Sequence, residues 1–548
     1  MTQSLAFRRT LAGVEGQVLV RAGLLAALAL LPAVFSPSLY DNFTLPKQSV
    51  LLVCAAIVLA GLVVEGEVLP RQRIVRLALL GWLGWMGLAT LTGLDPRGSL
   101  TGVYQYREGL LTQVAVGVLF LGAVQQGRSD VRLRDFLVAG AAGLAFAAAY
   151  TALQATGNDP FDWWIDTSVR AIGSIGNSNE LAAYAVIALA FAALGPALPG
   201  RWRLAVPFAV TLLVTFTVLE SESRSGLGGL AAAFILFPAA ALLVRMPRRD
   251  IAIYSAALLA GAVVALALSA PLGGANGSTT RVRAAVSEGD SSGSTRMSLI
   301  RGTVEVIRAD PLLGAGQDGL YLAFPLHRPE GLKGTFEEYD LTVQSSHNWF
   351  LDTAANTGVP GLVALMVLLG AVAFGSLKSE RRSGRAEIAF LWPAMAGYCA
   401  VAMLNPLSLA AHATFFVLLG YLAGRAERGL PAPTRAKVAP RFRSAMVAPA
   451  CISAFVLAII LPIADLAAQS GWDATASGDF ATAAMRYERA AAILPLERDY
   501  ASRHARSLLA DGAVTGNTTS LRAAKRSYEE FDERFGLGWN EALAYVAT

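Results

Sequence analysis

One histidine and three arginines are the residues of this sequence best placed to do chemistry, because each lies in a polar connection beside an apolar segment. We expect Ser345 or Ser346 to cap a helix that starts near His347 and stops at Asn356 or Gly358. The positive end of a helix disfavours the imidazolium ion. His347 would therefore be a neutral base at physiological pH.

Arg170 and Arg224 could each hold an anionic group such as a phosphate through charge-assisted hydrogen bonds. Arg170 precedes a turn rich in glycine and asparagine, whose free backbone N–H groups would add to its charge. The alternative is an ordinary turn in which Asn179 caps the following helix. Arg224 borders hydrocarbon, where an arginine is costly. It either binds a ligand or reaches outward to pair with Glu220 or Glu222.

Arg296 opens a helix that is predicted to run to Ala309, before Pro311 stops it. Three further charged residues of this helix are spaced to pair along one solvated face: Arg301, Glu305 and Arg308. Arg296 has no such partner downstream. It is therefore the better candidate for binding an anionic ligand.

The elements that must position these residues are membrane helices. Of the 548 residues, 54% are hydrophobic and 16% are charged, which is too apolar for a water-soluble protein of this length. The formal charge of +5 comes from short clusters of Lys and Arg between apolar runs, a pattern of membrane orientation and not of nucleic-acid binding. Cys54, Cys399 and Cys451 all lie inside apolar runs, so we expect no disulfide and no metal site.

Thirteen apolar runs are long enough to cross a bilayer. They lie near residues 18–35, 48–64, 74–92, 109–124, 136–155, 180–198, 204–219, 225–244, 251–270, 359–378, 386–404, 408–424 and 446–466. Basic clusters occupy alternate connections, which places the N-terminus inside and both the C-terminal tail and the connection 271–358 outside. We therefore predict an all-α polytopic membrane protein of about thirteen transmembrane helices.

Three short motifs lie on the same predicted outer side and follow one another along the chain. They are Ser225-Gly226 after Arg224, the Arg296 helix that ends before Pro311 and Gly314-x-Gly316, and the His347-Asn348 helix that ends at Gly358. In this order they resemble the O-antigen ligase superfamily. That superfamily also contains bacterial O-antigen and exopolysaccharide polymerases and protein O-oligosaccharyltransferases. The resemblance extends over roughly residues 18–425 in the layout of the helices.

The resemblance implies a glycosyltransferase of the GT-C type in the bacterial inner membrane, which uses a polyprenyl-diphosphate-linked glycan as donor. His347 would match the family's histidine base, and Arg224 and Arg296 would match arginines that hold the donor diphosphate. Arg170 joins them by its position. Supporting residues would be Asn348, Gly314 and Gly316. The reaction would invert the anomeric configuration and need no metal and no cofactor.

Four parts of the chain are expected. They are transmembrane helices 1–9 in residues 1–270, a large periplasmic loop with the catalytic helix in 271–358, transmembrane helices 10–13 in 359–466, and a periplasmic tail in 467–548. The loop begins with a stretch rich in Gly, Ser and Thr at 273–294 that we expect to be mobile. The tail fits a tetratricopeptide-type hairpin at Gly478, Asp479, Phe480, Ala483, Tyr487, Ala490 and Pro495, and a second helix pair is expected at 521–547. Since solenoid repeats need about three copies to be stable alone, we expect the tail to lean on the membrane domain or on a protein partner.

The sequence leaves the acceptor open. A ligase transfers the glycan to lipid A-core, a polymerase to a second lipid-linked glycan, and a protein O-oligosaccharyltransferase to a protein. A transporter of lipid-linked sugars would place its polar residues near the bilayer midplane, whereas the spans here are almost uncharged and the polar clusters lie outside them. A scaffold that recruits partners through its tail would leave the outer arginines without a role.

Overall fold

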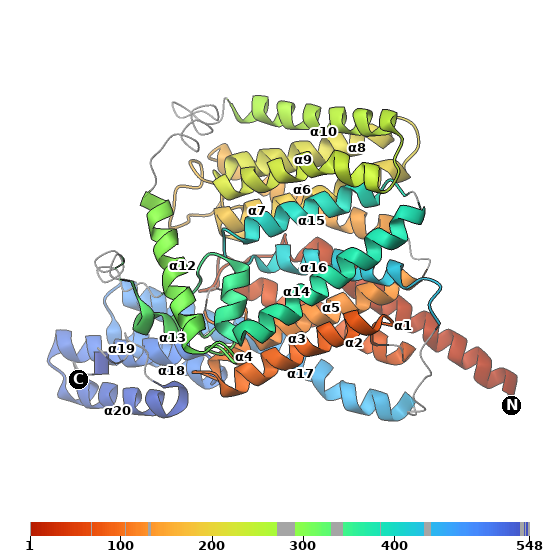
Figure 1. The fold of residues 1–548 in the computed structure, drawn as a ribbon. Coiled ribbons are helices and arrows are strands. Elements are labelled where there is room, and N and C mark those ends of the chain that lie inside the picture. The colour runs from red at the N-terminus through yellow and green to blue at the C-terminus, as the bar shows by residue number, and fades with distance from the viewer. Residues whose placement is uncertain are drawn as a thin grey trace.

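The computed structural model describes residues 2–66, 68–104, 106–129, 133–270, 291–329, 343–383, 385–431 and 440–536, with residues 332, 542, 544 and 545. Every regular element in these ranges is a helix (Figure 1). The stretch at 273–294 that we expected to be mobile lies outside the described residues as far as residue 290. Most of the chain after residue 536 also lies outside them, and with it the end of the second tail helix pair expected at 521–547.

Eleven of the described helices are long and apolar enough to cross a membrane. They are α2 (Thr44–Glu65), α3 (Arg73–Thr92), α5 (Leu110–Arg128), α6 (Leu133–Ala155), α7 (Ser178–Ala188) with its 3-10 continuation η2 (Leu189–Ala197), α8 (Trp202–Glu220), α9 (Arg224–Leu243), α10 (Arg248–Ser269), α14 (Trp349–Ser383), α16 (Leu409–Ala426) and α17 (Pro440–Ala476). Two shorter apolar helices, the end of α1 (Thr2–Leu30) and α15 (Ile388–Ala402), fill the two remaining predicted runs. The all-α polytopic fold is confirmed.

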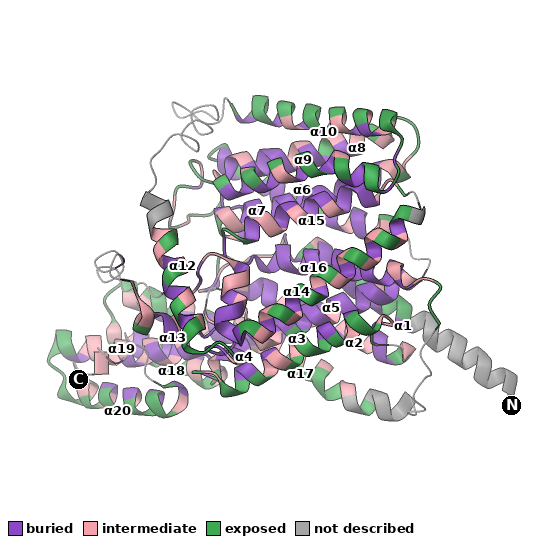
Figure 2. Ribbon diagram, in the orientation of Figure 1, coloured by how far each residue is buried: buried purple, intermediate pink, exposed green. Residues whose placement is uncertain are grey.

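Burial inside the bundle separates central from peripheral helices (Figure 2). In the most apolar stretch of α16, 94% of the residues are buried, and in that of α7 with η2 the share is 78%. In α17 it is only 17%. A helix that is apolar on all sides is stable either enclosed by other helices or facing lipid. The central helices α7 and α16 therefore provide rigid positions for the residues at their ends.

The two termini lie at opposite ends of the bundle, with α12 (Ser291–Ala309) and the tail at the end of the C-terminus (Figure 1). Several basic connections meet at the other end. There Arg128 Nε lies 2.6 Å from Glu427 Oε2, and Arg71 Nη1 donates to the carbonyl of Leu430 at 3.0 Å. Which end faces the cytoplasm stays a prediction from the charge pattern.

A break at Gly358 divides α14 into a short helix and a long apolar one, because Gly358 has φ 67° and ψ 175°. The short helix ends where the sequence predicted. Its last carbonyls accept hydrogen bonds from the segment Gly314–Gly316, which we call the glycine run. Ala315 N donates to Ala355 O at 2.9 Å, and Gly316 N donates to Asn356 O at 3.0 Å. The remaining short elements are α4 (Gly98–Thr101), η1 (Gly173–Ile175), α13 (Leu320–Ala323) and η4 (Phe324–His327).

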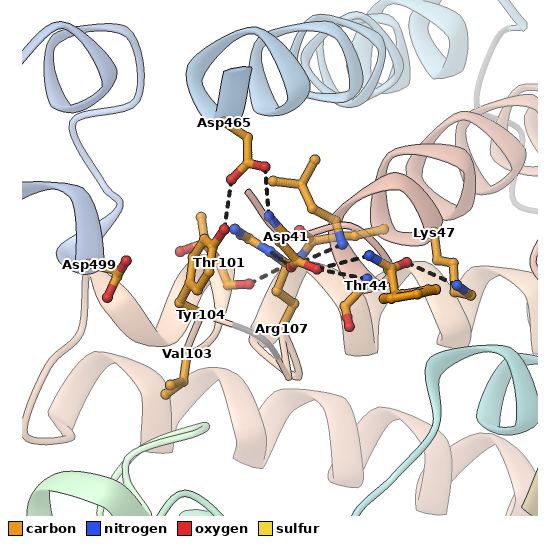
Figure 3. A network of polar contacts seen from close by, with 12 residues as sticks. Asp41, Thr44, Lys47, Thr101, Val103, Tyr104, Arg107, Asp465 and Asp499 are labelled. Carbon is orange, nitrogen blue, oxygen red and sulfur yellow. Dashed lines mark hydrogen bonds and ion pairs between the residues drawn. The ribbon is translucent and has the colours of Figure 1, made fainter. Parts of the chain in front are cut away.

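The tail consists of α18 (Phe480–Ile493), α19 (Arg498–Thr515) and α20 (Thr518–Phe535). It is joined to the membrane domain by a buried polar network, and Figure 3 shows the part of that network around Asp41, Tyr104, Arg107 and Asp465. Arg107 is fully buried. Its Nε lies 3.1 Å from Asp41 Oδ2, and its Nη1 lies 3.1 Å from Glu497 Oε2. Asp465 accepts hydrogen bonds from the hydroxyls of Tyr104 at 2.9 Å and Tyr500 at 2.6 Å. The tail therefore rests on the connections at this end of the bundle, while its assignment to the tetratricopeptide family stays a prediction.

Candidate active site

His347 lies one residue before the cap of α14. Asn348 is the cap, since its Oδ1 accepts from the N–H groups of Phe350 at 3.0 Å and Leu351 at 3.2 Å. The expectation that a serine caps this helix was wrong. An amide oxygen directly before the first helical residue satisfies two free N–H groups at once.

The two serines instead bind a carboxylate in the first turn of α14. Ser345 Oγ donates to Asp352 Oδ2 at 2.5 Å, and Ser346 N donates to Asp352 Oδ1 at 2.7 Å. Ser345 Oγ also accepts from the backbone N–H of His347 at 2.9 Å. These bonds fold the chain back onto its own helix and fix the backbone on which the imidazole is carried.

The conformation of His347 is unusual in two respects. Its φ of 59° is left-handed, a region that side chains other than glycine seldom adopt. Its Nδ1 is buried and has no hydrogen-bond partner within the described residues. Burial, followed by the positive charge of Arg296, lowers the pKa of the imidazole to about 4. His347 is therefore neutral at pH 7. A left-handed backbone at a residue other than glycine is strained, and such strain is characteristic of functional sites.

Arg296 is near both His347 and Arg170. It is half-buried on α12, and its charge lowers the pKa of His347 and also that of Arg170. For Arg170, burial is the larger cause and Glu222 acts in the opposite direction. Arg296 forms no hydrogen bond or ion pair with any residue that the structure describes. Three predicted site residues from three separate segments thus gather at one end of the bundle.

Arg170 is anchored to the start of α7. Its Nη2 donates to Asn179 Oδ1 at 3.2 Å, and its Nε donates to the carbonyl of Ser221 at 3.2 Å. The cap of α7 is Asn177, whose Oδ1 accepts from the N–H groups of Asn179 at 2.9 Å and Glu180 at 3.3 Å. The alternative in which Asn179 is the cap was therefore wrong. Asn177 takes that role, which leaves the Asn179 side chain for Arg170.

Arg224 is exposed at the first residue of α9, beside the same network. Ser223 caps α9 by accepting from Gly226 N at 3.2 Å, and its hydroxyl also donates to Asn179 Oδ1 at 3.0 Å. Asn179 thus ties Arg170 to the helix that carries Arg224. The starts of α7 and α9 bring the positive ends of two helix dipoles to the same place, which favours an anion.

Gly314 and Gly316 lie away from His347, at the far end of the short helix. Both have positive φ, 69° and 94°. A Cβ on Gly314 would lie 2.5 Å from the carbonyl oxygen of Ala355. Since nine residues of α-helix span about 13 Å, these glycines support the helix and do not touch a ligand at His347.

The sequence did not reveal a row of buried carboxylates beside this site. Asp318 Oδ2 accepts from the N–H groups of Val103 at 2.8 Å and Glu108 at 3.0 Å, and burial raises the pKa of Asp318 to about 6. Burial, with Asp318 and Asp352 nearby, raises the pKa of Glu108 well above its usual value. Glu108 lies 210 positions before Asp318, so no spacing pattern could have grouped these residues.

The arrangement offers two chemical capacities. Arginines and helix starts can bind a diphosphate or a similar anion. A neutral imidazole, with Nδ1 enclosed, can take up a proton at Nε2. In the part of the chain that the structure describes, no three side chains of His, Cys, Asp or Glu are grouped to hold a metal ion.

Residues 208–366 match the family model described as O-antigen ligase. The match includes Arg224, Arg296, His347 and the glycine run, and it excludes Arg170 and the tail. No curated protein matches the chain. The family match confirms the superfamily that the three motifs indicated.

Proposed function

We propose that this chain, a member of the O-antigen ligase and polymerase superfamily, is a membrane glycosyltransferase. It moves a glycan from a polyprenyl-diphosphate donor to an acceptor hydroxyl at the periplasmic face. The observation that supports this best is the meeting of Arg170, Arg296 and a neutral His347 at one end of the bundle, where Arg296 lies within electrostatic range of the other two. A base beside cations is what transfer from a diphosphate requires.

The arginines bind the donor. A lipid-linked donor enters from the bilayer, so its diphosphate rests at the interface, where Arg224, Arg296 and Arg170 reach it with charge-assisted bonds. The same charges stabilise the diphosphate as it leaves with the bonding electrons of the broken C–O bond. No cofactor takes part.

His347 activates the acceptor. Its Nε2 accepts the proton of the acceptor hydroxyl while the oxygen forms a bond to the anomeric carbon. The attack occurs opposite the leaving diphosphate, so the single displacement inverts the anomeric configuration. The proton then passes from His347 to water.

Donor binding strengthens this base. In the free protein the charge of Arg296 contributes to the low pKa of His347. A bound diphosphate places negative charge beside Arg296 and offsets that effect, which raises the pKa of His347. The imidazole is therefore a better proton acceptor when the donor is present.

The experiment is glycan transfer by the purified protein in lipid, with a polyprenyl-diphosphate glycan, a hydroxyl acceptor and a parallel sample containing a chelator. We expect an inverted glycosidic product that survives chelation. Absence of transfer to lipid A-core, glycan and protein acceptors alike would contradict the proposal. A deletion strain identifies the acceptor, because loss of all attached glycan indicates a ligase and attachment of single repeat units indicates a polymerase.

A further inference from the structure

A small polar cavity lies among the starts of the central helices. Its lining includes Lys47 of α2, Tyr106, Glu180 of α7 and Ser408 directly before α16. The cavity is partly open and has a volume of about 10 Å³, which is room for a single water molecule or a single hydroxyl group. Nothing in the mechanism above uses it.

Lys47 brings a buried amino group to this cavity. Its side chain is 2% exposed, and Nζ donates to the carbonyls of Phe43 at 3.0 Å and Ser174 at 2.7 Å. An ammonium group has three donors. These two hydrogen bonds therefore join α2 to the turn before α7, and they leave one N–H of the ammonium group for the cavity.

Glu180 and Ser408 supply the complementary groups. Within the described chain the carboxylate of Glu180 forms no hydrogen bond or ion pair, even with Lys47 on the same wall. Ser408 occupies the cap position of α16, yet its hydroxyl caps nothing. Ser408 is 1% exposed, and its hydroxyl has no hydrogen-bond partner among the residues that the structure describes.

Open donors and acceptors around a one-hydroxyl space point to a ligand group that both donates and accepts. Buried polar groups without partners are costly, so such groups are satisfied by a water or a ligand. A sugar hydroxyl can accept from Lys47 while it donates to Glu180. A bound water can do the same, and it is the rival explanation.

The lining of the cavity is linked along the chain to two parts of the candidate active site. On one side, Glu180 follows Asn179, which binds Arg170. On the other side, Tyr106 lies two residues before Glu108, whose neighbour Asp352 binds the serines ahead of His347. A glycosyl group held between the arginines and His347 would therefore have the cavity next to it.

We infer that this cavity is a subsite for one hydroxyl of a sugar bound beside the diphosphate, with Glu180, Lys47 and Ser408 as its hydrogen-bonding groups. The inference rests on the proposed function. The sugar belongs either to the donor glycan or to the acceptor. The same chemistry serves both.

The test compares wild-type protein with Glu180→Gln, which keeps the shape of the side chain, and with Ser408→Ala. Binding of bare polyprenyl diphosphate and of the polyprenyl-diphosphate glycan is measured, together with the KM for the acceptor. If the sugar belongs to the donor, we expect Glu180→Gln to weaken binding of the glycan-bearing lipid about tenfold and to leave binding of the bare lipid unchanged. For an acceptor sugar, the acceptor KM rises about tenfold instead.

Asp166→Asn is the control, because the described hydrogen bonds of this exposed carboxylate lie within its own turn, to Ser168 and to the backbone of Val169. Thermal melting of each variant verifies folding, and Ser408→Ala decides the matter if Glu180→Gln fails to fold. Unchanged constants in both variants, or equal weakening of bare and glycan-bearing lipid, would overturn the subsite and indicate a water-filled cavity. Wild-type protein that neither binds nor uses any lipid-linked glycan would instead overturn the proposed function.

Discussion

In the proposed mechanism, Arg296 couples ligand binding to proton transfer. Its charge reaches His347 and Arg170, and it forms no ion pair of its own in the described structure. The sequence could single it out because Arg301 and Arg308 had a carboxylate within one helical turn and Arg296 did not. The structure pairs Arg308 with Glu305 at 2.6 Å and leaves Arg301 exposed without an ion pair among the described residues.

Arg296→Ala should weaken donor binding about ten- to a hundred-fold, since a charge-assisted bond is worth about 1.5 to 3 kcal/mol. Arg296→Lys should keep part of the affinity. Removal of the positive charge should also raise the pKa of His347, which histidine NMR titration can measure. Arg301→Ala is the matched control on the same helix, with binding close to wild type. Equal binding by Arg296→Ala and Arg301→Ala would assign Arg296 a structural role.

At this scale the sequence revealed residue types better than their partners. Ser, Asn and Asp are almost equally good caps, so neighbouring candidates such as Ser345 and Asn348, or Asn177 and Asn179, could not be ranked. The groups around the cavity, Lys47 and Glu180 among them, come from helices far apart in the chain. Only tertiary packing brings such residues together.

The short helix of α14 depends on close backbone contact. Val359 N donates to Pro311 O at 2.8 Å, and a Cβ on Gly358 would lie 2.1 Å from the carbonyl oxygen of Leu312. The left-handed φ of 67° at Gly358 adds to this requirement. Close backbone contacts therefore hold the far end of the element that carries His347, and the indole N–H of Trp85 adds hydrogen bonds to Thr357 O at 3.0 Å and Leu312 O at 3.1 Å.

Gly358→Ala should lower the melting temperature and remove most of the activity, because the new methyl group pushes the segment that contains Gly314 and Gly316 away from the helix. Gly370→Ala, later in α14, has no atom within 4 Å of its added Cβ and should be neutral or slightly stabilising. Melting and transfer rate measured in parallel check both. Identical behaviour of the two variants would show that the contact at Gly358 is unimportant.

The spans were the most predictable elements, because about twenty apolar residues in succession leave few alternatives to a membrane helix. Boundaries outside the bilayer were less predictable. The helix expected to open at Arg296 begins at Ser291, and α17 continues to Ala476, well past the expected end of its span at 466. In water the hydrocarbon no longer limits the length of a helix, so packing decides where it stops.

At the scale of the whole molecule, the tail and the membrane domain share one buried charge network. Arg107 joins Asp41 before α2 to Glu497 before α19, and all three are almost completely buried. Loss of one partner of a buried ion pair is destabilising by about 3 to 5 kcal/mol, because the remaining charge stays uncompensated.

Glu497→Ala should therefore lower the melting temperature markedly and reduce activity, since the connection that holds Arg107 also carries Glu108. Glu488→Ala, exposed on α18, should be close to wild type. Thermal melting of purified protein measures both. A tail that moves independently of the membrane domain would instead give indistinguishable melting curves.

The orientation of the whole chain follows from its basic connections. The N- and C-termini lie at opposite ends of the bundle (Figure 1), and the basic end carries the N-terminus. A reporter that works only outside the cytoplasm should be active when fused after Thr548. Activity of a cytoplasm-only reporter at that position would reverse the topology and place the candidate site on the wrong face.

The central claim is that His347 is the base of a metal-independent transfer, and His347→Gln tests it most directly. Gln has similar hydrogen-bonding capacity but takes up no proton at neutral pH. The measurement is steady-state transfer as a function of pH, which gives both kcat/KM and kcat, with and without a chelator.

Because the pKa of His347 is lowered to about 4, its base form is present above that pH and is lost as the pH falls through it. The acid limb of kcat/KM should therefore lie near pH 4, and that of kcat should lie higher, because bound donor raises the pKa. We expect His347→Gln to bind donor normally, to lose about 10² to 10⁴ in rate and to lose this limb. Wild-type turnover by His347→Gln, or abolition of wild-type turnover by the chelator, would contradict the account.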